Sequence, residues 1–480
     1  MKNNNYVGGQ WVAGEGSIKN INPSDTNDII DEYTNATSQQ LNDAVASAHI
    51  AQKKWENVGI EKRANILHNI GSELIIQSKE IGTLLSREEG KTLPEGVGEV
   101  VRSGQQFQYY AASALRQFGE NIASTRDGVS VEMSREPVGV CGIISPWNFP
   151  IAIAAWKAAP AMAFGNAVIL KPASQTPASA IALTKIISEQ KDIPEGLFNL
   201  VLGGGGTIGH QISGHPDIAA ISFTGSVGVG KTIYMEAAKS MKKMQLEMGS
   251  KNPLVVMDDA DLNIAVACAT NGAYGGTGQK CTASSRLIVH EKVYKEFTEK
   301  LIESISALKV GHALEEGSQM GPVSSETQLQ SNLDYIEVGK KEAKLAYGGN
   351  PMNMRTPGYY MEPTLFIDGD NKSTINQEEM FGPIACVIPV KSYEEGLEVA
   401  NDTIFGLSSG IVTQSLSKAA DFKKNIKTGV TTVNLPTAGL DYHVPFGGRK
   451  ASSFGPREQG TYAHEFYTHV KTTYVSPGKI

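Results

Sequence analysis

The stretch VGVCGIISPWNFPIAIAAWKAAPAMAFGNAVIL, residues 138–170, decides the fold. It contains two short apolar runs, 138–144 and 167–170, of the kind that form buried parallel strands. Val138 to Trp156 carries no charge and is long enough to imitate a membrane span. Pro146 and Pro150 interrupt it, and proline breaks helical hydrogen bonding. We therefore predict a buried strand, a loop and the start of a helix, and no membrane span.

The same alternation of apolar runs and helical stretches continues along the chain. It is typical of βαβ units, in which helices cover a parallel sheet. A second series begins near residue 252, so we predict an α/β protein with two such domains in tandem. The further runs are FNLVL (198–202), AAISF (219–223), NPLVVM (252–257), RLIVH (286–290) and ACVIPV (385–390).

The segments before residue 138 and after residue 467 show other spacings of their apolar residues. Helical spacing predicts one helix from Ser38, a second running through 64–85, and a third from about Glu99 to Leu115. Asp127-Gly128 is a hairpin signal, and residues 129–134 after it alternate apolar and polar side chains. The tail 468–476 alternates too, and we expect it to pair either with that strand or with the sheet edge of another subunit.

Composition excludes several classes. The 480 residues carry a formal net charge of −7 with scattered basic residues, which argues against a nucleic-acid partner. Four cysteines without C-x-x-C spacing form neither a disulfide framework nor a zinc site, and we predict no metal centre. The start MKNNNYVGGQW has no apolar signal-peptide core, so we expect a cytoplasmic protein.

Two glycine patterns suggest a phosphate site. Residues 225–232, GSVGVGKT, match the phosphate-loop expression, and 255–258 resemble a strand ending in a magnesium-binding Asp, so a P-loop nucleotide hydrolase is one alternative. Gly204-x-Gly206-x-x-Gly209 matches the dinucleotide pattern weakly, because it lies in a run of glycines. Either turn could instead be a tight turn that needs positive φ. A helix N-terminus after such a turn suits an anionic phosphate.

Four further segments decide between these alternatives: SPWNFP (145–150), LEMGSKNP (246–253), GQKCTASSR (278–286) and EEMFGP (378–383). In their order and separations they resemble the aldehyde dehydrogenase superfamily over essentially the whole chain. The resemblance implies a Rossmann-type cofactor domain, an α/β catalytic domain and a β oligomerisation arm, in a homodimer or homotetramer. The implied boundaries are 1–118 with 138–249 for the cofactor domain, 250–450 for the catalytic domain, and 119–137 with 451–480 for the arm and tail.

The resemblance also assigns catalytic roles. Taken alone, a cysteine is usually a small buried hydrophobe, but polar neighbours place Cys281 in an accessible loop, and the family makes it the nucleophile. Glu247 lies in an apolar setting and becomes the general base that hydrolyses the thioester, so we expect a free acid as product. Asn148, otherwise a turn residue between prolines, becomes an oxyanion donor together with the backbone N–H of Cys281.

For the cofactor, the resemblance implies a dinucleotide along the first sheet. Many NAD-preferring relatives carry Glu at the position of Ser174, which would repel a 2′-phosphate. We therefore predict NADP, with NAD tolerated. The implied cofactor residues are Ile144, Ser145, Pro146, Trp147, Lys171, Ala173, Ser174, Gly205, Gly209, Phe223, Thr224, Gly225, Ser226, Val229, Met248, Gly249, Gln328, Glu379 and Phe381.

The resemblance implies that the substrate is an aldehyde. The stretch 434–460 looks most like the 2-oxoglutarate semialdehyde (2,5-dioxopentanoate) dehydrogenases, with succinate semialdehyde or another aldehyde as the alternative. A substrate carboxylate needs a cation or polar donors, for which Arg102, Gln105 and Ser285 are the sequence candidates. We expect Lys280 to face outward as a surface lysine. Position in the family places six residues along the access tunnel, namely Phe149, Ala152, Ile153, Trp156, Thr282 and Phe446.

Overall fold

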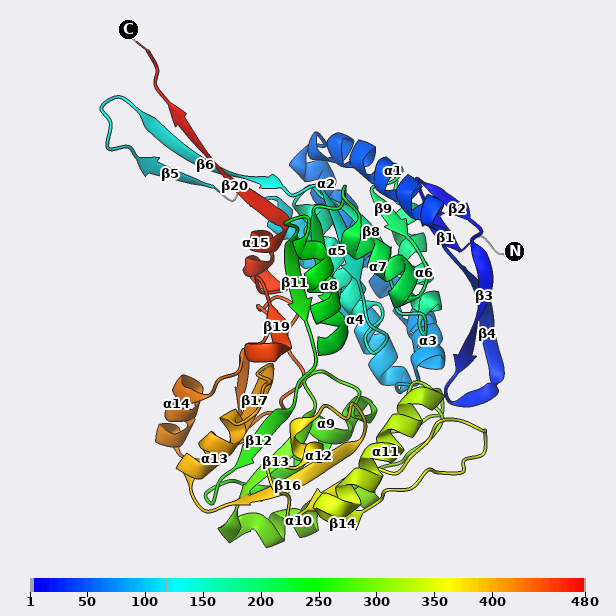
Figure 1. The fold of residues 1–480 in the computed structure, drawn as a ribbon, viewed down its shortest axis with the longest axis vertical. Helices are drawn as coiled ribbons and strands as arrows, with labels where there is room; N and C mark the ends of the chain where they lie inside the picture. The colour runs from blue at the N-terminus through cyan, green and yellow to red at the C-terminus, as the bar shows by residue number, and fades with distance from the viewer. Residues whose placement is uncertain (1–3, 117–118, 479–480) are drawn as a thin grey trace.

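A computed structural model describes residues 4–116 and 119–478 of the chain. Figure 1 shows two lobes, each built on one large sheet, and a thin arm that projects from the upper lobe and carries the C-terminus. The predicted boundary at residue 118, the first three residues of the predicted cofactor domain and the last two of the tail lie outside the described residues.

The first sheet has eight strands in the order β19-β11-β10-β7-β8-β9-β1-β2. The strands from β11 to β9 are parallel, and β7, the first of these in the chain, lies between β8 and β10. The chain therefore reverses its direction of winding at β7, which is the Rossmann-type arrangement. The strands are β1 Asn5–Val7, β2 Gln10–Val12, β7 Val140–Ile144, β8 Ala167–Lys171, β9 Phe198–Leu200, β10 Ala220–Thr224, β11 Lys243–Glu247 and β19 Ser453–Phe454.

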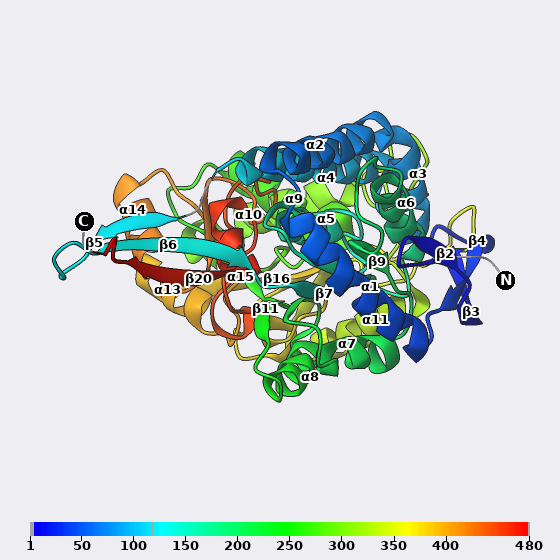
Figure 2. The ribbon, with the colours of Figure 1, turned by 90° about the horizontal axis from the view of Figure 1, so that it is seen from above.

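Helices cover this sheet on both faces (Figures 1 and 2). Their buried sides are apolar, as Leu41, Ala44, Val45 and Ala48 of the first helix illustrate. The helices are α1 Ser38–Glu56, α2 Ile60–Ile76, α3 Ser78–Glu89, α4 Leu93–Ala114, α5 Ala152–Ala163, α6 Pro177–Ser188, the short π-helix η1 Gly205–Gly209, α7 His210–Gly214 and α8 Val227–Ala238.

The second sheet has seven strands in the order β14-β15-β16-β13-β12-β17-β18, all parallel except β14. Its strands are β12 Asn252–Val256, β13 Ser284–His290, β14 Lys344–Tyr347, β15 Thr364–Ile367, β16 Ile384–Val390, β17 Ser408–Val412 and β18 Val430–Val433. Its helices are α9 Leu262–Tyr274, η2 Gly275–Gly278, α10 Glu291–Ser306, α11 Glu326–Glu342, α12 Thr374–Gln377, α13 Tyr393–Asn401 and α14 Leu416–Asn425.

Two small sheets complete the fold. The arm has the order β20-β6-β5, so the tail pairs with the hairpin strand of its own chain, which is the first of the two predicted pairings. These strands are β5 Glu120–Ala123, β6 Ser130–Pro137 and β20 Thr468–Val475, and the separate hairpin is β3 Glu15–Asn22 with β4 Asp25–Asn35. The short helices η3 Lys450–Ser452, η4 Gly460–Ala463 and α15 His464–Tyr467 connect the second sheet to the arm.

The α/β class and the seven quoted apolar strands are confirmed, with ends shifted by up to two residues. Other sequence expectations need correction. The helical run 64–85 is two helices that meet at Gln77, and both α2 and α3 pack on α4. The third helix starts at Leu93 rather than Glu99, where Thr92 and Glu95 form a capping box. Part of the predicted arm, β19, pairs instead with β11 of the first sheet.

The uncharged stretch 138–156 forms β7, a loop and the first turns of α5, as predicted. Over residues 4–116 and 119–478, no helix combines the length and apolarity needed to cross a bilayer.

Candidate active site

Cys281 lies in the loop between η2 and β13, and the backbone before it is unusual. Gly276, Thr277 and Gly278 have φ of 59°, 56° and 66° in succession. A Cβ at Gly278 would lie 2.2 Å from the carbonyl oxygen of Gly382, so only glycine fits there. A β-branched residue disfavours positive φ, but the buried Thr277 hydroxyl donates to the Gly321 carbonyl at 3.2 Å. The loop that carries the cysteine is thus held in one shape.

Asn252 fixes the same loop from the other side. Its buried amide donates to the carbonyl oxygens of Cys281 at 2.8 Å and Ala283 at 2.9 Å. Its carbonyl oxygen accepts from the backbone N–H of Ser408 at 3.0 Å, which ties the loop to β17. Asn252 lies inside a segment that the sequence singled out, yet its role could not be read there because its partners are backbone groups far along the chain.

The Cys281 thiol is the one cysteine of the four that is partly exposed. Burial of its surroundings raises the pKa of this thiol to about 12, and the carboxylates of Glu379 and Glu247 add to the effect. Its own backbone N–H acts in the opposite direction. At neutral pH Cys281 is therefore a protonated thiol, and attack on a carbonyl requires that it lose its proton.

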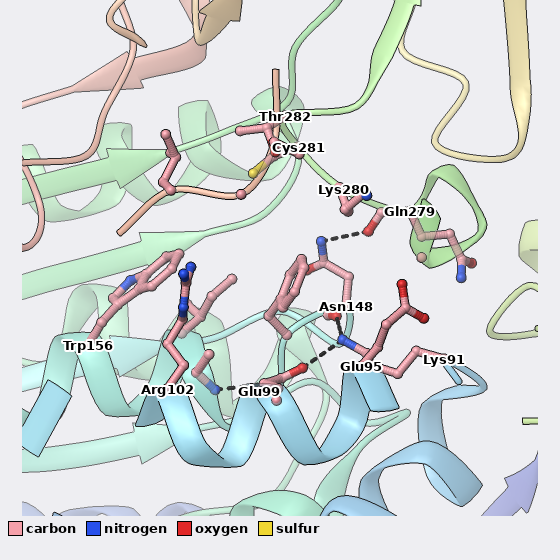
Figure 3. A pocket seen from close by; sticks show the side chains of 18 of the residues that line it. Lys91, Glu95, Glu99, Arg102, Asn148, Trp156, Gln279, Lys280, Cys281 and Thr282 are labelled. Atoms are coloured by element: carbon pink, nitrogen blue, oxygen red, sulfur yellow. Dashed lines mark hydrogen bonds and ion pairs between the residues drawn. The ribbon is translucent and has the colours of Figure 1, made fainter. Parts of the chain in front are cut away.

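Asn148 faces the nucleophile loop from the loop between β7 and α5. Its side-chain amide donates to the Gln279 carbonyl at 2.9 Å (Figure 3). An amide nitrogen carries two N–H groups, so a second donor remains. The backbone carbonyl of Asn148 accepts from the Lys91 ammonium at 2.6 Å. The two sides of the site are thus joined through one asparagine.

A buried ion pair supports this segment. The Lys91 ammonium lies 2.6 Å from a carboxylate oxygen of Glu99 and 4.0 Å from the centre of the Phe149 ring. The other carboxylate oxygen of Glu99 accepts from the backbone N–H groups of Ile151 and Ala152, each at 3.1 Å. These N–H groups lie at the start of α5, where an anion is favourable. Neither Lys91 nor Glu99 was assigned a role from sequence.

Glu247 ends β11 and is buried. Its partner across the sheet is Ser453 of β19, whose hydroxyl donates to the carboxylate at 2.5 Å. Burial, and then the nearby charge of Glu458, hold the pKa of Glu247 well above its usual range. Both causes favour the protonated form of this carboxyl, and it can act as a base only in its deprotonated form.

A cavity of about 390 Å³ opens beside Cys281 (Figure 3). All six residues predicted for the tunnel line it, and so does Arg102, whereas Gln105 and Ser285 do not. Lys280 also lines the cavity and is partly buried, so its predicted outward orientation is wrong; its ammonium donates to the Asn271 carbonyl at 3.3 Å. The lining residues with a charge or a catalytic prediction are Glu89, Lys91, Glu95, Glu99, Arg102, Asn148, Lys280 and Cys281.

The predicted cofactor residues gather at the carboxyl edge of the first sheet. Ser145 follows β7 and Thr224 ends the neighbouring β10, at the point where the winding reverses, and neither buried hydroxyl has a hydrogen-bond partner among residues 4–116 and 119–478. Lys171 ends the next strand, and within the part of the chain that the structure describes its ammonium donates only to the Pro172 carbonyl, at 2.6 Å. The helix α8 begins nearby, capped by Ser226. Orphaned donors beside a helix N-terminus fit a dinucleotide.

Close backbone packing explains several of the glycines. A Cβ on Gly225 would lie 2.5 Å from the Phe223 ring, and one on Gly230 would lie 2.4 Å from the Met248 sulfur. A Cβ on Gly205, in contrast, would meet no atom within 4 Å. The first two glycines are thus required by packing, whereas Gly205 and Gly206 border open space at the sheet edge.

The two lobes meet around Phe381. Its ring packs edge-on against Trp147 with centroids 5.4 Å apart, and its backbone has φ of 54°. Gln328 donates to the carbonyls of Met380 at 3.3 Å and Phe381 at 3.1 Å, so its side chain supports this loop. Glu379 accepts from the Ser250 N–H at 2.8 Å, and burial raises its pKa to about 7.

The other predicted cofactor residues lie along the same edge. A Cβ on Gly249 would lie 2.0 Å from the Glu379 carboxylate, and one on Gly209 would lie 3.3 Å from the Lys171 side chain. Ser174 donates weakly to the Gly203 carbonyl, at 3.4 Å. The rest are Ile144 at the end of β7, Pro146 in the following loop, Ala173 after β8 and Val229 in the first turn of α8. The cofactor roles of all these residues remain predictions.

The phosphate-loop match has an ordinary explanation. Its Lys231 is exposed on α8, and the Thr232 hydroxyl donates to the Gly228 carbonyl within the helix. The described residues contain no cluster of three His, Cys, Asp or Glu side chains that could hold a metal ion.

A Rossmann-type sheet that faces a loop with an accessible cysteine defines a dinucleotide-dependent oxidoreductase, and comparison with known proteins identifies which kind. The model of the aldehyde dehydrogenase family matches residues 11–473. The chain is 41% identical to the alpha-ketoglutaric semialdehyde dehydrogenase of Bacillus subtilis, over 98% of both chains. It is 38% identical to the 2,5-dioxopentanoate dehydrogenase of Saccharolobus solfataricus, over 99% of both.

Solved structures agree. The crystal structure of betaine aldehyde dehydrogenase from Staphylococcus aureus in complex with NAD+ matches with a TM-score of 0.96 and 31% identity, over 100% of this chain and 96% of that one. This chain belongs to the aldehyde dehydrogenase family and is an NAD(P)-dependent enzyme of that family. The P-loop hydrolase alternative is therefore wrong.

Proposed function

We propose that this enzyme oxidises 2-oxoglutarate semialdehyde to the free acid 2-oxoglutarate through a thioester on Cys281, with NADP preferred and NAD tolerated. One water and one oxidised cofactor are consumed, and one reduced cofactor and one proton are released. The observation that carries the chemistry is that Cys281 and Asn148 line one cavity, while Glu247 is near enough for its charge to raise the pKa of the thiol.

In the first half-reaction the deprotonated sulfur of Cys281 attacks the aldehyde carbon, which forms a thiohemiacetal. The free N–H of the Asn148 amide and the backbone N–H of Cys281 stabilise the oxygen that becomes negative. The bound nicotinamide supplies the acceptor for the hydride that this carbon loses. Cys281 is then a thioester.

In the second half-reaction Glu247 takes a proton from water, and the resulting hydroxide attacks the thioester carbon. The C–S bond breaks, the acid leaves and Cys281 regains its proton. Intact-protein mass spectrometry after a brief turnover should detect the acyl adduct on Cys281. Normal turnover by a Cys281→Ala enzyme would refute this pathway.

The preference for NADP is supported by the charges around Lys171. The pKa of this buried lysine is lowered to about 8 by burial alone, without an acidic neighbour among its causes. A 2′-phosphate would supply the missing counter-charge, and Ser174 offers a hydroxyl where a Glu would repel it. We expect a higher kcat/KM with NADP than with NAD and a reversal in Ser174→Glu. Strong discrimination against NADP in the wild type would contradict the assignment.

The choice of substrate is supported by relatives at about 40% identity that are named for this semialdehyde, and by the cationic side chains in the cavity. Succinate semialdehyde is the second candidate, because it differs only in length and in the keto group. Initial rates for these two semialdehydes and for betaine aldehyde would separate the choices. A preference for the cationic aldehyde would remove the substrate assignment while leaving the reaction intact.

We also propose a cytoplasmic homodimer or homotetramer that uses the arm. Its outer face exposes apolar side chains, since Val470 is 55% and Tyr474 58% exposed. Light scattering of the full chain and of a chain that ends before Thr468 would test this, and a monomeric full chain would contradict it.

A further inference from the structure

One face of α4 forms a wall of the cavity. Glu95, Glu99 and Arg102 are spaced four and three residues apart, so a helix places them on one side. All three line the cavity that contains Cys281. In Figure 3 the Arg102 side chain extends from this helix beside Trp156, toward the side of the cavity where Cys281 lies.

Most charged side chains that line this cavity already form hydrogen bonds or ion pairs within the protein. Lys91 is bound by Glu99 and the Asn148 carbonyl. Glu95 accepts from the Thr92 N–H at 3.1 Å and the Thr92 hydroxyl at 2.8 Å, in the cap of α4. Lys280 donates to a backbone carbonyl. These contacts are local and fix the walls.

Arg102 differs from these residues. Over residues 4–116 and 119–478 its guanidinium has neither a hydrogen-bond nor an ion-pair partner in the protein, although it is partly buried. Burial lowers its pKa from the usual value, with Asp441 as the opposing charge, but a guanidinium stays protonated in proteins. The planar guanidinium of Arg102, with its five N–H donors, is thus available to a ligand in the cavity.

The rest of the wall suits a carbon chain. Phe149, Ile153, Trp156 and Phe446 are apolar, and the Trp156 and Phe446 rings pack with centroids 5.5 Å apart. Of the cations in the cavity, Lys91 already lies 3.9 Å from Glu89 and 2.6 Å from Glu99, which leaves the Arg102 guanidinium to attract an anion. An aldehyde that ends in a carboxylate would meet both features.

We propose that Arg102 determines the substrate specificity of the cavity. Its paired N–H groups bind the distal carboxylate of the substrate while the aldehyde carbon lies at Cys281. This proposal rests on the proposed function and adds the residue that recognises the negative charge of the substrate. A bidentate guanidinium–carboxylate contact is directional, so it selects the length of the substrate as well as its charge.

The test compares glutarate semialdehyde with pentanal, which have five carbons each and differ in the carboxylate. For Arg102→Gln we expect the ratio of kcat/KM for these two aldehydes to fall about 10- to 100-fold, mainly through KM for the semialdehyde. Arg102→Lys should keep part of the preference, because it restores the charge without the planar fork. Gln105→Ala, on the same helix but outside the cavity, should keep the wild-type ratio.

Two further variants exclude other roles. If Arg102 only held the 438–441 segment through Asp441, Asp441→Asn would lower the ratio as Arg102→Gln does, and that result would overturn the proposal. If Lys280→Gln lowered the ratio while Arg102→Gln did not, the carboxylate site would be at Lys280 and the proposal would also fail.

The outcomes separate the two levels of inference. A wild-type enzyme that oxidises pentanal as efficiently as glutarate semialdehyde contradicts the substrate class of the proposed function. A wild-type preference that survives in Arg102→Gln contradicts only the role of Arg102. Matching melting temperatures of wild type and variants would show that a lost ratio is not a folding defect.

Discussion

Two groups of ionisable residues around the active site differ in how their charges are compensated. On the α4 side, Lys91, Glu99 and the start of α5 form a closed network of contacts between 2.6 and 3.1 Å. On the nucleophile side, Cys281, Glu247 and Glu379 all have raised pKa values, and burial is the largest cause for each. The Lys91–Glu99 pair is thus compensated by opposite charge, whereas the proposed nucleophile Cys281 and the proposed base Glu247 are each held toward their protonated form.

The largest effect should follow loss of the sulfur. Cys281→Ala removes the proposed nucleophile, so aldehyde-dependent formation of reduced cofactor should fall at least about a thousandfold. The matched control is Cys268→Ala, because that cysteine is buried in the core beside α10. Absorbance at 340 nm measures both. Comparable loss in both variants would mean that cysteine removal harms the fold and not the chemistry.

The next effect separates the two half-reactions. In Glu247→Gln the thioester should still form but hydrolyse slowly, since a positioned base contributes about 10²- to 10⁴-fold. Rapid mixing should then give a burst of about one reduced cofactor per active site, followed by a slow steady rate. An equal loss of burst and steady rate would place Glu247 in the first half-reaction instead.

A third prediction concerns the buried ion pair between Lys91 and Glu99 on the α4 side of the cavity. Lys91→Met leaves Glu99 buried without its cation, and breaking a buried pair costs about 3–5 kcal/mol. We expect a melting temperature lower by several degrees and a fall in kcat, because the Asn148 carbonyl also loses its donor. Lys53→Met, which removes an exposed pair with Glu56, should leave the melting temperature unchanged. Equal melting temperatures of the two variants would show that the Lys91–Glu99 network does not stabilise the fold.

The last prediction concerns the dependence of cysteine reactivity on pH. A thiol with a raised pKa is protonated below that pKa, so its thiolate fraction grows about tenfold per pH unit until the pKa is approached. Alkylation of Cys281 by iodoacetamide in the cofactor-free enzyme should therefore keep rising from pH 7 to pH 10. A plateau near pH 8.5, as for an ordinary cysteine, would contradict a raised pKa. Cys281→Ser provides the background, since the other cysteines are buried.

Much of the fold could be predicted because local apolar runs and turn signals report strands directly. The strands that were not anticipated lack such signals. β11, KMQLE, mixes polar and apolar residues although four of its five residues are buried, and β1 and β2 have three residues each. The break at Gln77 was also missed, because the apolar helical spacing continues across it, from Leu74 of α2 to Ile81 and Leu85 of α3.

The sequence by itself determined the α/β class, the family and the identity of the residues proposed to react, because these depend on motifs and on the period of apolar side chains. Only the tertiary structure decided which charges are saturated and which are free. It excluded Gln105 and Ser285 from the cavity, turned Lys280 toward it and left Arg102 without a hydrogen-bond or ion-pair partner among the residues that the structure describes. Hydrogen-bond partners and burial depend on residues distant in the chain, and no local pattern encodes them.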